Sequence, residues 1–153
     1  MAVEAADNID HGEVKKFEDL ASRWWDPNSE FKPLHDINPL RLDYINSAVS
    51  LKGKRVLDVG CGEGHAAAYF REIGCDVMAI DGSIQAERDS VVPDIHHRHD
   101  YVDGPFLPEG SWDAVWCCEF VEHVEEQYTH HFLATFASAC KYVVMTFAEP
   151  GRF

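Results

Sequence analysis

The stretch VLDVGCGEGH (residues 56–65) joins an apolar run of β type to the alanine-rich segment that follows it. Its three glycines, Gly60, Gly62 and Gly64, occupy every second position where a strand would give way to a helix. Glycine permits close backbone approaches that side chains obstruct. In an open α/β sheet the ligand crevice lies beyond the carboxyl ends of the strands, next to such turns. We therefore expect the three glycines to contact a bound ligand.

Apolar runs alternate with helical patterns from residue 53 onward. The strand candidates are RVLDVG, DVMAID, HHRHDYV, SWDAVWCCEF and KYVVMTF. Between them lie the helical patterns HAAAYFREIG, a short segment near residues 83–90, and a segment around residues 124–139. This alternation predicts βαβ units in an α/β fold with a doubly wound, mostly parallel sheet.

The segment before residue 53 has a different pattern. Helical spacing of apolar residues runs over 13–25, breaks at Pro27 and Asn28, and resumes over 39–49. We predict an N-terminal helical flap over 1–52 and a ligand-binding domain over 53–153. A chain of 153 residues with 46% apolar content is long enough for one globular unit with its own core.

Charge and cysteine content limit the possible classes of protein further. The chain has 27 acidic against 13 basic residues, a net charge of -14, which offers nucleic acid no general electrostatic footprint. No apolar run is as long as a membrane span, and residues 1–16 have no hydrophobic signal core. The five cysteines include no CxxC pair, which is typical of reduced thiols. We expect a cytoplasmic protein.

Two carboxylates accompany the glycine turn. Asp58 lies two residues before the first glycine, where it would disfavour an anionic pyrophosphate but suit a ligand with an amino group and a sulfonium centre. Asp81 ends the next predicted strand, where a carboxylate can accept hydrogen bonds from both hydroxyls of an unphosphorylated ribose. A tight strand-to-helix connection without a ligand is the alternative.

VLDVGCGEG, AID and HDYVDG together resemble motifs of the class I S-adenosylmethionine-dependent methyltransferases. The resemblance implies a Rossmann-like sheet and S-adenosylmethionine as the cofactor. It also implies that Asp100, or a neighbouring backbone amide, contacts the adenine, and that Cys118 lies against the same ring. A turn residue after a strand is the alternative role for Asp100.

The run DHGEVKKFEDLASRWWDPNSEFKPLHDINPLRLDYI (residues 10–45) resembles the N-terminal signature of the ubiquinone-biosynthesis O-methyltransferases, which methylate polyprenylated catechol-type rings. This resemblance implies that Arg41 binds the cofactor carboxylate; an ion pair with an acidic residue is the alternative. A polyprenylated aromatic substrate resides in a membrane, so peripheral membrane contact is a hypothesis.

Folds of this class continue through a C-terminal hairpin. Because the sequence stops at EPGRF, we expect the sheet to lack that hairpin, as a fragment or a reduced domain would.

The exit of the fourth predicted strand contains Glu119, Glu122 and His123. Methyl transfer to a phenol requires loss of a proton whose pKa is near 10, so a base or a cation must assist. The spacing brings these three side chains together if the exit is helical. They would then hold Mg²⁺ or Mn²⁺, or His123 with Glu122 would act as the general base. A solvated, acidic helix start is the third interpretation.

Other interpretations also stay open. His96, His97 and His99 form a histidine tract that we interpret as part of an exposed edge strand. The acceptor could be another small molecule or a nucleic acid, although the acidic charge disfavours the latter. A non-catalytic cofactor-binding or interaction module is the hypothesis from a different class.

Overall fold

The computed structural model describes residue 28 and residues 32–147. The helix expected over 13–25 lies outside these residues. The chain divides into two compact units, Met1–Asp43 and Tyr44–Phe153. Helix α2 (Lys32–Val49) begins seven residues before the predicted start at Pro39 and contains that proline. Pro39 removes one backbone donor but does not end the helix, so the prediction used this residue as a boundary wrongly.

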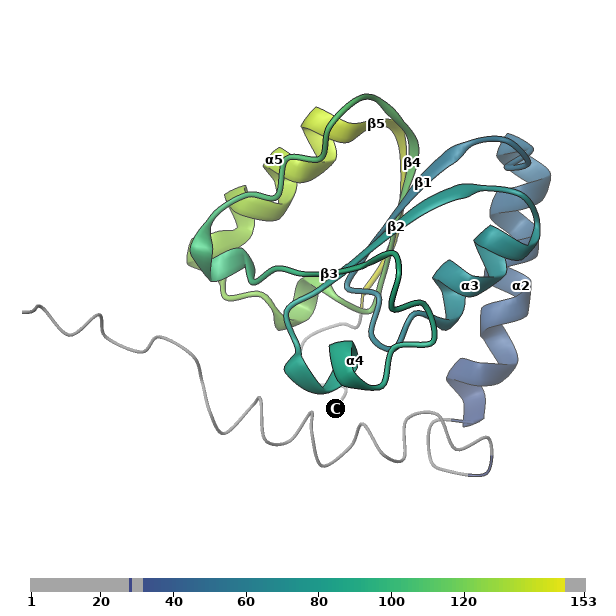
Figure 1. Cartoon of the computed structure of the whole chain (residues 1–153), viewed down its shortest axis with the longest axis horizontal. Helices are drawn as coiled ribbons and strands as arrows, with labels where there is room; N and C mark the ends of the chain where they lie inside the picture. Colours follow the sequence, from purple (N-terminus) through teal and green to yellow (C-terminus); the bar gives the residue numbers. More distant parts are fainter. Residues whose placement is uncertain (1–27, 29–31, 148–153) are drawn as a thin grey trace, which may run out of the picture. The chain divides into compact units, whose positions relative to one another are not determined.

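A parallel sheet of five strands forms the second unit (Figure 1). The strands are β1 (Arg55–Val59), β2 (Asp76–Asp81), β3 (His96–Arg98), β4 (Trp112–Cys118) and β5 (Cys140–Thr146). Their spatial order is β3-β2-β1-β4-β5, and every pairing is parallel. The predicted doubly wound α/β architecture is confirmed.

Helices cover both faces of this sheet. Helix α3 (His65–Glu72) and helix α5 (Thr129–Ala139) lie on opposite sides of it, as Figure 1 shows. Helix α4 (Ile84–Arg88) follows β2. Short 3₁₀ turns occupy η1 (Tyr101–Asp103), η2 (Val121–His123) and η3 (Glu126–Tyr128). Among the helices of the described residues, none is both long and apolar enough to span a membrane.

The exit of β4 differs from the sequence prediction. The helix expected around 124–139 begins only at Thr129, because two 3₁₀ turns fill the segment before it. An acidic run is typical of the first turn of an α-helix. Here Glu125 and Glu126 instead precede α5 and belong to a 3₁₀ turn and its cap.

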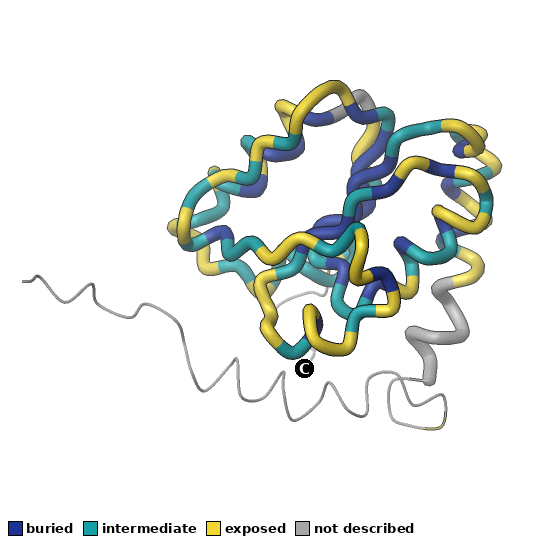
Figure 2. Tube along the Cα trace, in the orientation of Figure 1, coloured by how far each residue is buried: buried dark blue, intermediate teal, exposed yellow. Residues whose placement is uncertain are grey.

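The central strands are buried along their length, as the dark blue segments of Figure 2 show. Strand β1 is covered on both faces, and Leu57 and Val59 are fully buried. Val115 and Cys117 on β4 are equally inaccessible. Strands buried on both sides need continuous apolar runs rather than alternation, which is the pattern of AVWCC and, apart from Asp58, of VLDV.

The strand order reverses at β1. Strand β1 pairs with β2 on one side and β4 on the other, through Leu57↔Met78 and Leu57↔Val115. The connection from β1 runs to β2, whereas β4 is reached only after β3. Such a topological switch point opens a crevice at the carboxyl ends of the two central strands. The glycine turn leaves β1 at this point, and the segment 119–123 leaves β4 beside it.

One edge of the described sheet is formed by β5. Tyr142, Val143 and Met145 of this strand are exposed, to 55%, 44% and 42%. An edge strand seldom exposes three apolar side chains to water.

Thr135 anchors the loop after β3 to helix α5. Its buried hydroxyl accepts hydrogen bonds from the Tyr101 hydroxyl (3.0 Å) and the Phe106 N–H (3.2 Å). The same hydroxyl donates to the Phe106 carbonyl at 2.6 Å. The bond with Tyr101 is buried and the two bonds with Phe106 are partly buried, so their loss would leave polar groups poorly satisfied.

Replacing Thr135 with Val keeps the shape and removes the hydroxyl. We expect Thr135→Val to lower the free energy of unfolding by about 2 to 4 kcal/mol, measured by urea denaturation. Thr135→Ser keeps the hydroxyl and loses one methyl, so it should cost about 1 kcal/mol. Equal losses in the two variants would contradict the role of the hydroxyl.

Candidate functional site

The glycine turn is closely packed by side chains from later in the chain. A Cβ atom built on Gly60 would lie 2.4 Å from the ring of Phe120, just past β4. A Cβ on Gly64 would lie 2.4 Å from Cγ2 of Val92. Both glycines also have positive φ angles, 73° and 89°. The sequence prediction gave the ligand as the reason for glycine, but at these two positions the protein's own packing already requires it.

The middle glycine connects the turn to the end of β2. The N–H of Gly62 donates to Asp81 Oδ2 at 2.9 Å, and the N–H of Ser83 donates to Asp81 Oδ1 at 2.8 Å. A carboxylate offers about four lone-pair sites, so both oxygens keep capacity for further donors. Burial raises the pKa of Asp81 above its ordinary value, while the two backbone N–H groups oppose the shift. The arrangement suits a carboxylate that receives a pair of hydroxyls.

Asp58 is the most deeply buried carboxylate among the described residues. The residue is 2% exposed, and its Oδ2 has no hydrogen-bond partner among the described residues. Burial, with a smaller contribution from the negative charge of Asp81, raises the pKa of Asp58 to about 8; a hydrogen bond from the Ala67 N–H opposes the shift. A buried carboxylate without a full set of partners is costly. A cationic ligand group at the switch point would offset that cost.

The end of β3 lies beside the end of β2. A Cβ on Gly82 would lie 3.2 Å from the His99 carbonyl oxygen and 3.7 Å from Cβ of Asp100. The fold therefore brings Asp100 close to the segment that follows Asp81. The Asp100 side chain caps η1 by accepting from the Val102 N–H at 2.9 Å. This contact matches the alternative role as a turn residue, and a contact with adenine stays a prediction.

The exit of β4 starts with a backbone in the left-handed region. Glu119 has a φ of 52°, a conformation that non-glycine residues adopt rarely. Two bonds to Thr146 at the end of β5 hold it: the Glu119 N–H donates to the Thr146 carbonyl (2.9 Å), and the Thr146 hydroxyl donates to Glu119 Oε1 (3.0 Å). Strained residues of this kind cluster at functional sites.

Glu122 and His123 follow the left-handed Glu119 by three and four residues. Glu122 and His123 lie in the 3₁₀ turn η2, with Glu122 Oε1 3.8 Å from His123 Nε2. The side chain of Glu122 is 17% exposed and that of His123 is 33% exposed. Burial raises the pKa of the Cys117 thiol, and the nearby acidic groups of Asp58, Cys118 and Glu122 raise it further. The exit of β4 thus brings acid–base groups to the switch point.

A metal site is not assembled by these three residues. Within the described residues, no group of three His, Cys, Asp or Glu side chains is arranged to hold a metal ion. The expected ligand set assumed a helical exit, which would have aligned Glu119 with the other two. The left-handed turn at Glu119 directs one of its oxygens to Thr146 instead. We therefore derive no chemical step through magnesium.

Cys118 and Arg41 are the other two residues predicted to contact the cofactor. Cys118 is the last residue of β4 and is half-buried, next to Glu119 at the switch point. Arg41 lies on helix α2, in the unit formed by residues 1–43. The cofactor contacts of both stay predictions from the sequence.

One cavity of the described residues lies away from the glycine turn. A cavity of about 290 Å³ is lined by Ala48, Val49, Lys54, Asp113 and Tyr142. Lys54 and Asp113 lie at the amino ends of β1 and β4, opposite the glycine turn. Ligands of doubly wound sheets bind at the carboxyl ends, so this cavity is not the candidate site.

Sequence reasoning missed the residues that support the turn. Phe120 and Val92 fill the spaces over two glycines, and Thr146 restrains the strained exit of β4. Phe120 carried a local signal, since a large apolar residue directly after a strand has to be buried somewhere. The contacts of Val92 and Thr146 form only in the folded chain and have no local signal in the sequence.

An open parallel α/β sheet with a glycine turn and two carboxylates at its switch point defines a nucleotide-type ligand-binding domain. A family model described as a methyltransferase domain matches residues 34–152. The chain belongs to this methyltransferase domain family.

Curated relatives are similar over most of the chain. A protein of Ralstonia nicotianae named ubiquinone biosynthesis O-methyltransferase is 44% identical over 154 residues, which are 94% of this chain and 59% of that protein. A protein of the same name from Dechloromonas aromatica is 50% identical over 127 residues, covering 76% of this chain and 53% of its own length. The chain spans 53% to 61% of the lengths of such relatives.

Solved structures share the fold at lower identity. The DhpI-SAM-HEP complex superposes with a TM-score of 0.67 at 20% identity, covering 92% of this chain and 66% of that one. Magnesium protoporphyrin IX methyltransferase from Synechocystis, with bound SAM, gives a TM-score of 0.67 at 18% identity, covering 88% and 71%. These likenesses support the fold, which is that of class I methyltransferases.

The raised pKa of Asp58 has a consequence for stability. In the unfolded chain this carboxyl ionises near 3.8, whereas in the folded chain it ionises near 8. A raised folded-state pKa favours folding fully below the unfolded value, and this contribution is lost as the pH rises through the folded value. Asp58 should therefore destabilise the ligand-free fold increasingly as the pH rises.

Asp58→Asn removes this pH dependence. We expect the unfolding free energy of the variant, relative to wild type, to rise by at least about 1 kcal/mol between about pH 5 and about pH 8. Urea denaturation at the two pH values measures it. A difference that stays constant or falls with pH would show that Asp58 is ionised in the ligand-free fold.

Proposed function

We propose that this chain binds S-adenosylmethionine at the β1/β4 switch point and forms the cofactor half of an O-methyltransferase of ubiquinone biosynthesis. The observation that carries the proposal is the pair of carboxylates, Asp58 and Asp81, held against the glycine turn. The names of the curated relatives, at 44% and 50% identity, support the reaction and pathway.

Different residues of the chain would bind different groups of this cofactor. Asp81 would accept the two ribose hydroxyls, since each of its oxygens now receives a single backbone donor. Asp58, with an orphaned buried oxygen, would favour the positively charged amino group and sulfonium. The turn of Gly60, Gly62 and Gly64 would lie along the ligand, and Arg41 would pair with its carboxylate. Asp100 and Cys118 would border the adenine.

The cofactor supplies an electrophilic methyl group on a sulfonium, and the remaining work falls to the chain. The acceptor hydroxyl must lose its proton, and His123 in the turn η2 is the natural general base. Glu122 lies 3.8 Å from the imidazole and would stabilise its protonated form. Glu122 adds negative charge at this end of the sheet, and Asp58 would add a second charge when it ionises, which favours a cationic cofactor over a neutral one.

A polyprenylated phenol or catechol is the acceptor that the resemblance of residues 10–45 favours. Such a substrate partitions into a lipid bilayer, so the active protein would contact the membrane surface peripherally. Co-sedimentation with liposomes that contain a prenylated phenol tests this part of the proposal. Protein that stays in the supernatant at every lipid concentration would count against it.

Asp81→Asn tests the cofactor site directly. The amide keeps the size of the side chain but places an N–H₂ group where an acceptor is needed. We expect the affinity for S-adenosylhomocysteine, measured by calorimetry, to fall by about 1 to 3 kcal/mol, or roughly 5- to 150-fold. Asp76→Asn at the exposed amino end of the same strand is the matched control and should bind normally. Equal affinity in both variants would remove Asp81 from the site.

Methyl transfer to a catechol bearing a short prenyl chain tests the catalytic assignment. His123→Gln should lower kcat by about 100-fold at neutral pH, because loss of a general base costs that much, while the affinity for S-adenosylhomocysteine is retained. His130→Gln, on an exposed position of α5, is the control.

Assays in EDTA and in excess Mg²⁺ separate the base from a metal. Activity that persists in EDTA and depends on His123 supports the base. Activity that appears only with Mg²⁺ would restore the metal hypothesis for Glu119, Glu122 and His123. Tight binding of S-adenosylhomocysteine with no transfer to any hydroxyl would favour a non-catalytic module.

A further inference from the structure

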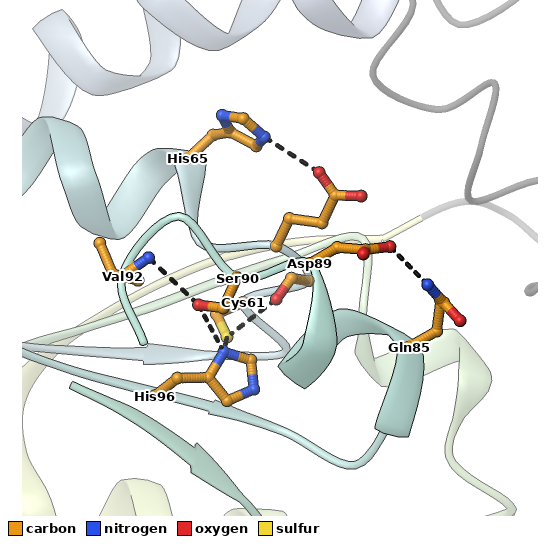
Figure 3. Close-up of polar contacts among 9 residues, drawn as sticks. Cys61, His65, Gln85, Asp89, Ser90, Val92 and His96 are labelled. Carbon is orange, nitrogen blue, oxygen red and sulfur yellow. Dashed lines mark hydrogen bonds and ion pairs between the residues drawn. The ribbon is translucent and has the colours of Figure 1, made fainter. Parts of the chain in front are cut away.

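A second layer of residues lies behind the glycine turn and is built around His96. The sequence placed His96 on an exposed strand edge, but the residue is half-buried and faces the turn. Its Nδ1 lies 3.1 Å from the Ser90 hydroxyl and 3.8 Å from the Cys61 sulfur. Figure 3 shows the Nδ1 side of the ring directed at both partners. Cys61 is the residue between the first two glycines, so the ring contacts the turn itself.

The segment after α4 is fastened to the same turn at further points. The Val91 N–H donates to the Glu63 carbonyl at 2.8 Å, and the Val92 N–H donates to the Ser90 hydroxyl at 3.1 Å. The fully buried Val92 side chain occupies the space that a Cβ on Gly64 would need. Ser90 therefore links this segment to β3, because one hydroxyl contacts both the Val92 backbone and the His96 ring.

His96 acts here as a neutral hydrogen-bonding group. Its Nε2 is buried and has no hydrogen-bond partner among the residues that the structure describes. An imidazolium would carry an N–H donor on both nitrogens, and one of them would be buried without an acceptor. Burial accordingly lowers the pKa of His96, although the negative charges of Asp81 and Glu87 oppose the shift.

The turn that His96 supports is the one that holds Asp81. The N–H groups of Gly60 and Cys61 both donate to the Ile80 carbonyl, at 2.8 and 3.0 Å. The next N–H, that of Gly62, donates to the Asp81 carboxylate. A shift of Cys61 would therefore displace the donor that orients Asp81. Small displacements of this kind weaken binding because the site no longer matches the ligand.

We propose that His96 is a positioning residue for the cofactor turn, which it fixes through Nδ1 to Ser90 and Cys61 without touching the cofactor. The inference rests on the proposed function only for its consequence, weaker cofactor binding. Its structural part, a turn that loosens when Nδ1 is removed, can be measured in the ligand-free chain.

Two substitutions separate the hydrogen bond from the bulk of the ring. His96→Leu removes both nitrogens, whereas His96→Asn keeps a polar atom near the position of Nδ1. We expect His96→Leu to speed amide exchange of Gly60, Cys61 and Gly62, followed by NMR, by about tenfold and to weaken S-adenosylhomocysteine binding by about tenfold. His96→Asn should stay within about threefold of wild type in both measurements. His97→Leu, on the exposed neighbour, is the matched control.

Each outcome decides the proposal. Unchanged exchange in His96→Leu overturns it, and equal losses in His96→Leu and His96→Asn overturn the hydrogen-bond role in favour of simple packing. If the wild-type chain binds no S-adenosylhomocysteine but His96→Leu still loosens the turn, the proposed function fails while the positioning role is supported. If His96→Leu does not fold, Ser90→Ala removes the same bond from the other side and should loosen the same three amides.

Discussion

The placement of two carboxylates, the buried Asp58 and the half-buried Asp81, beside one glycine turn is the constraint on which the proposed site depends. Asp58 and Asp81 end up next to each other because β1 and β2 pair in parallel and finish at the same edge. Burial raises the pKa of both carboxyl groups, and the negative charge of Asp81 raises the pKa of Asp58 further. A fold without a ligand would gain by losing one of these groups. Their presence supports the proposal that a charged ligand binds here.

The rest of the domain serves to hold the turn between those carboxylates. Phe120 from the exit of β4 and Val92 from the loop after α4 pack on the outer glycines from two directions. The middle glycine is left to donate its N–H to Asp81. The strained Glu119 is restrained by Thr146 of β5, so the edge strand contributes to the site although it lies away from the turn. The left-handed backbone at Glu119 costs stability, and the contacts around it give the site a defined geometry.

The sheet and the glycine turn could be predicted because their signals are local. Strands buried on both faces require continuous apolar runs, and a turn without side chains requires glycine. The exit of β4 could not be predicted, because the left-handed Glu119 is held by Thr146, which is distant in sequence. The same reason hid His96, whose partners are Cys61 and Ser90. Periodicity reports which face of an element is buried but not which residue of another element it meets.

Titration of the isotopically labelled 153-residue chain with S-adenosylhomocysteine, followed by amide NMR, tests the central claim most directly. The account predicts saturable shifts concentrated at Gly60, Gly62, Asp81 and Glu119, on the two sides of the switch point. Shifts that cluster instead around Lys54 and Tyr142 at the opposite edge, or no saturable shifts from a folded chain, would contradict it.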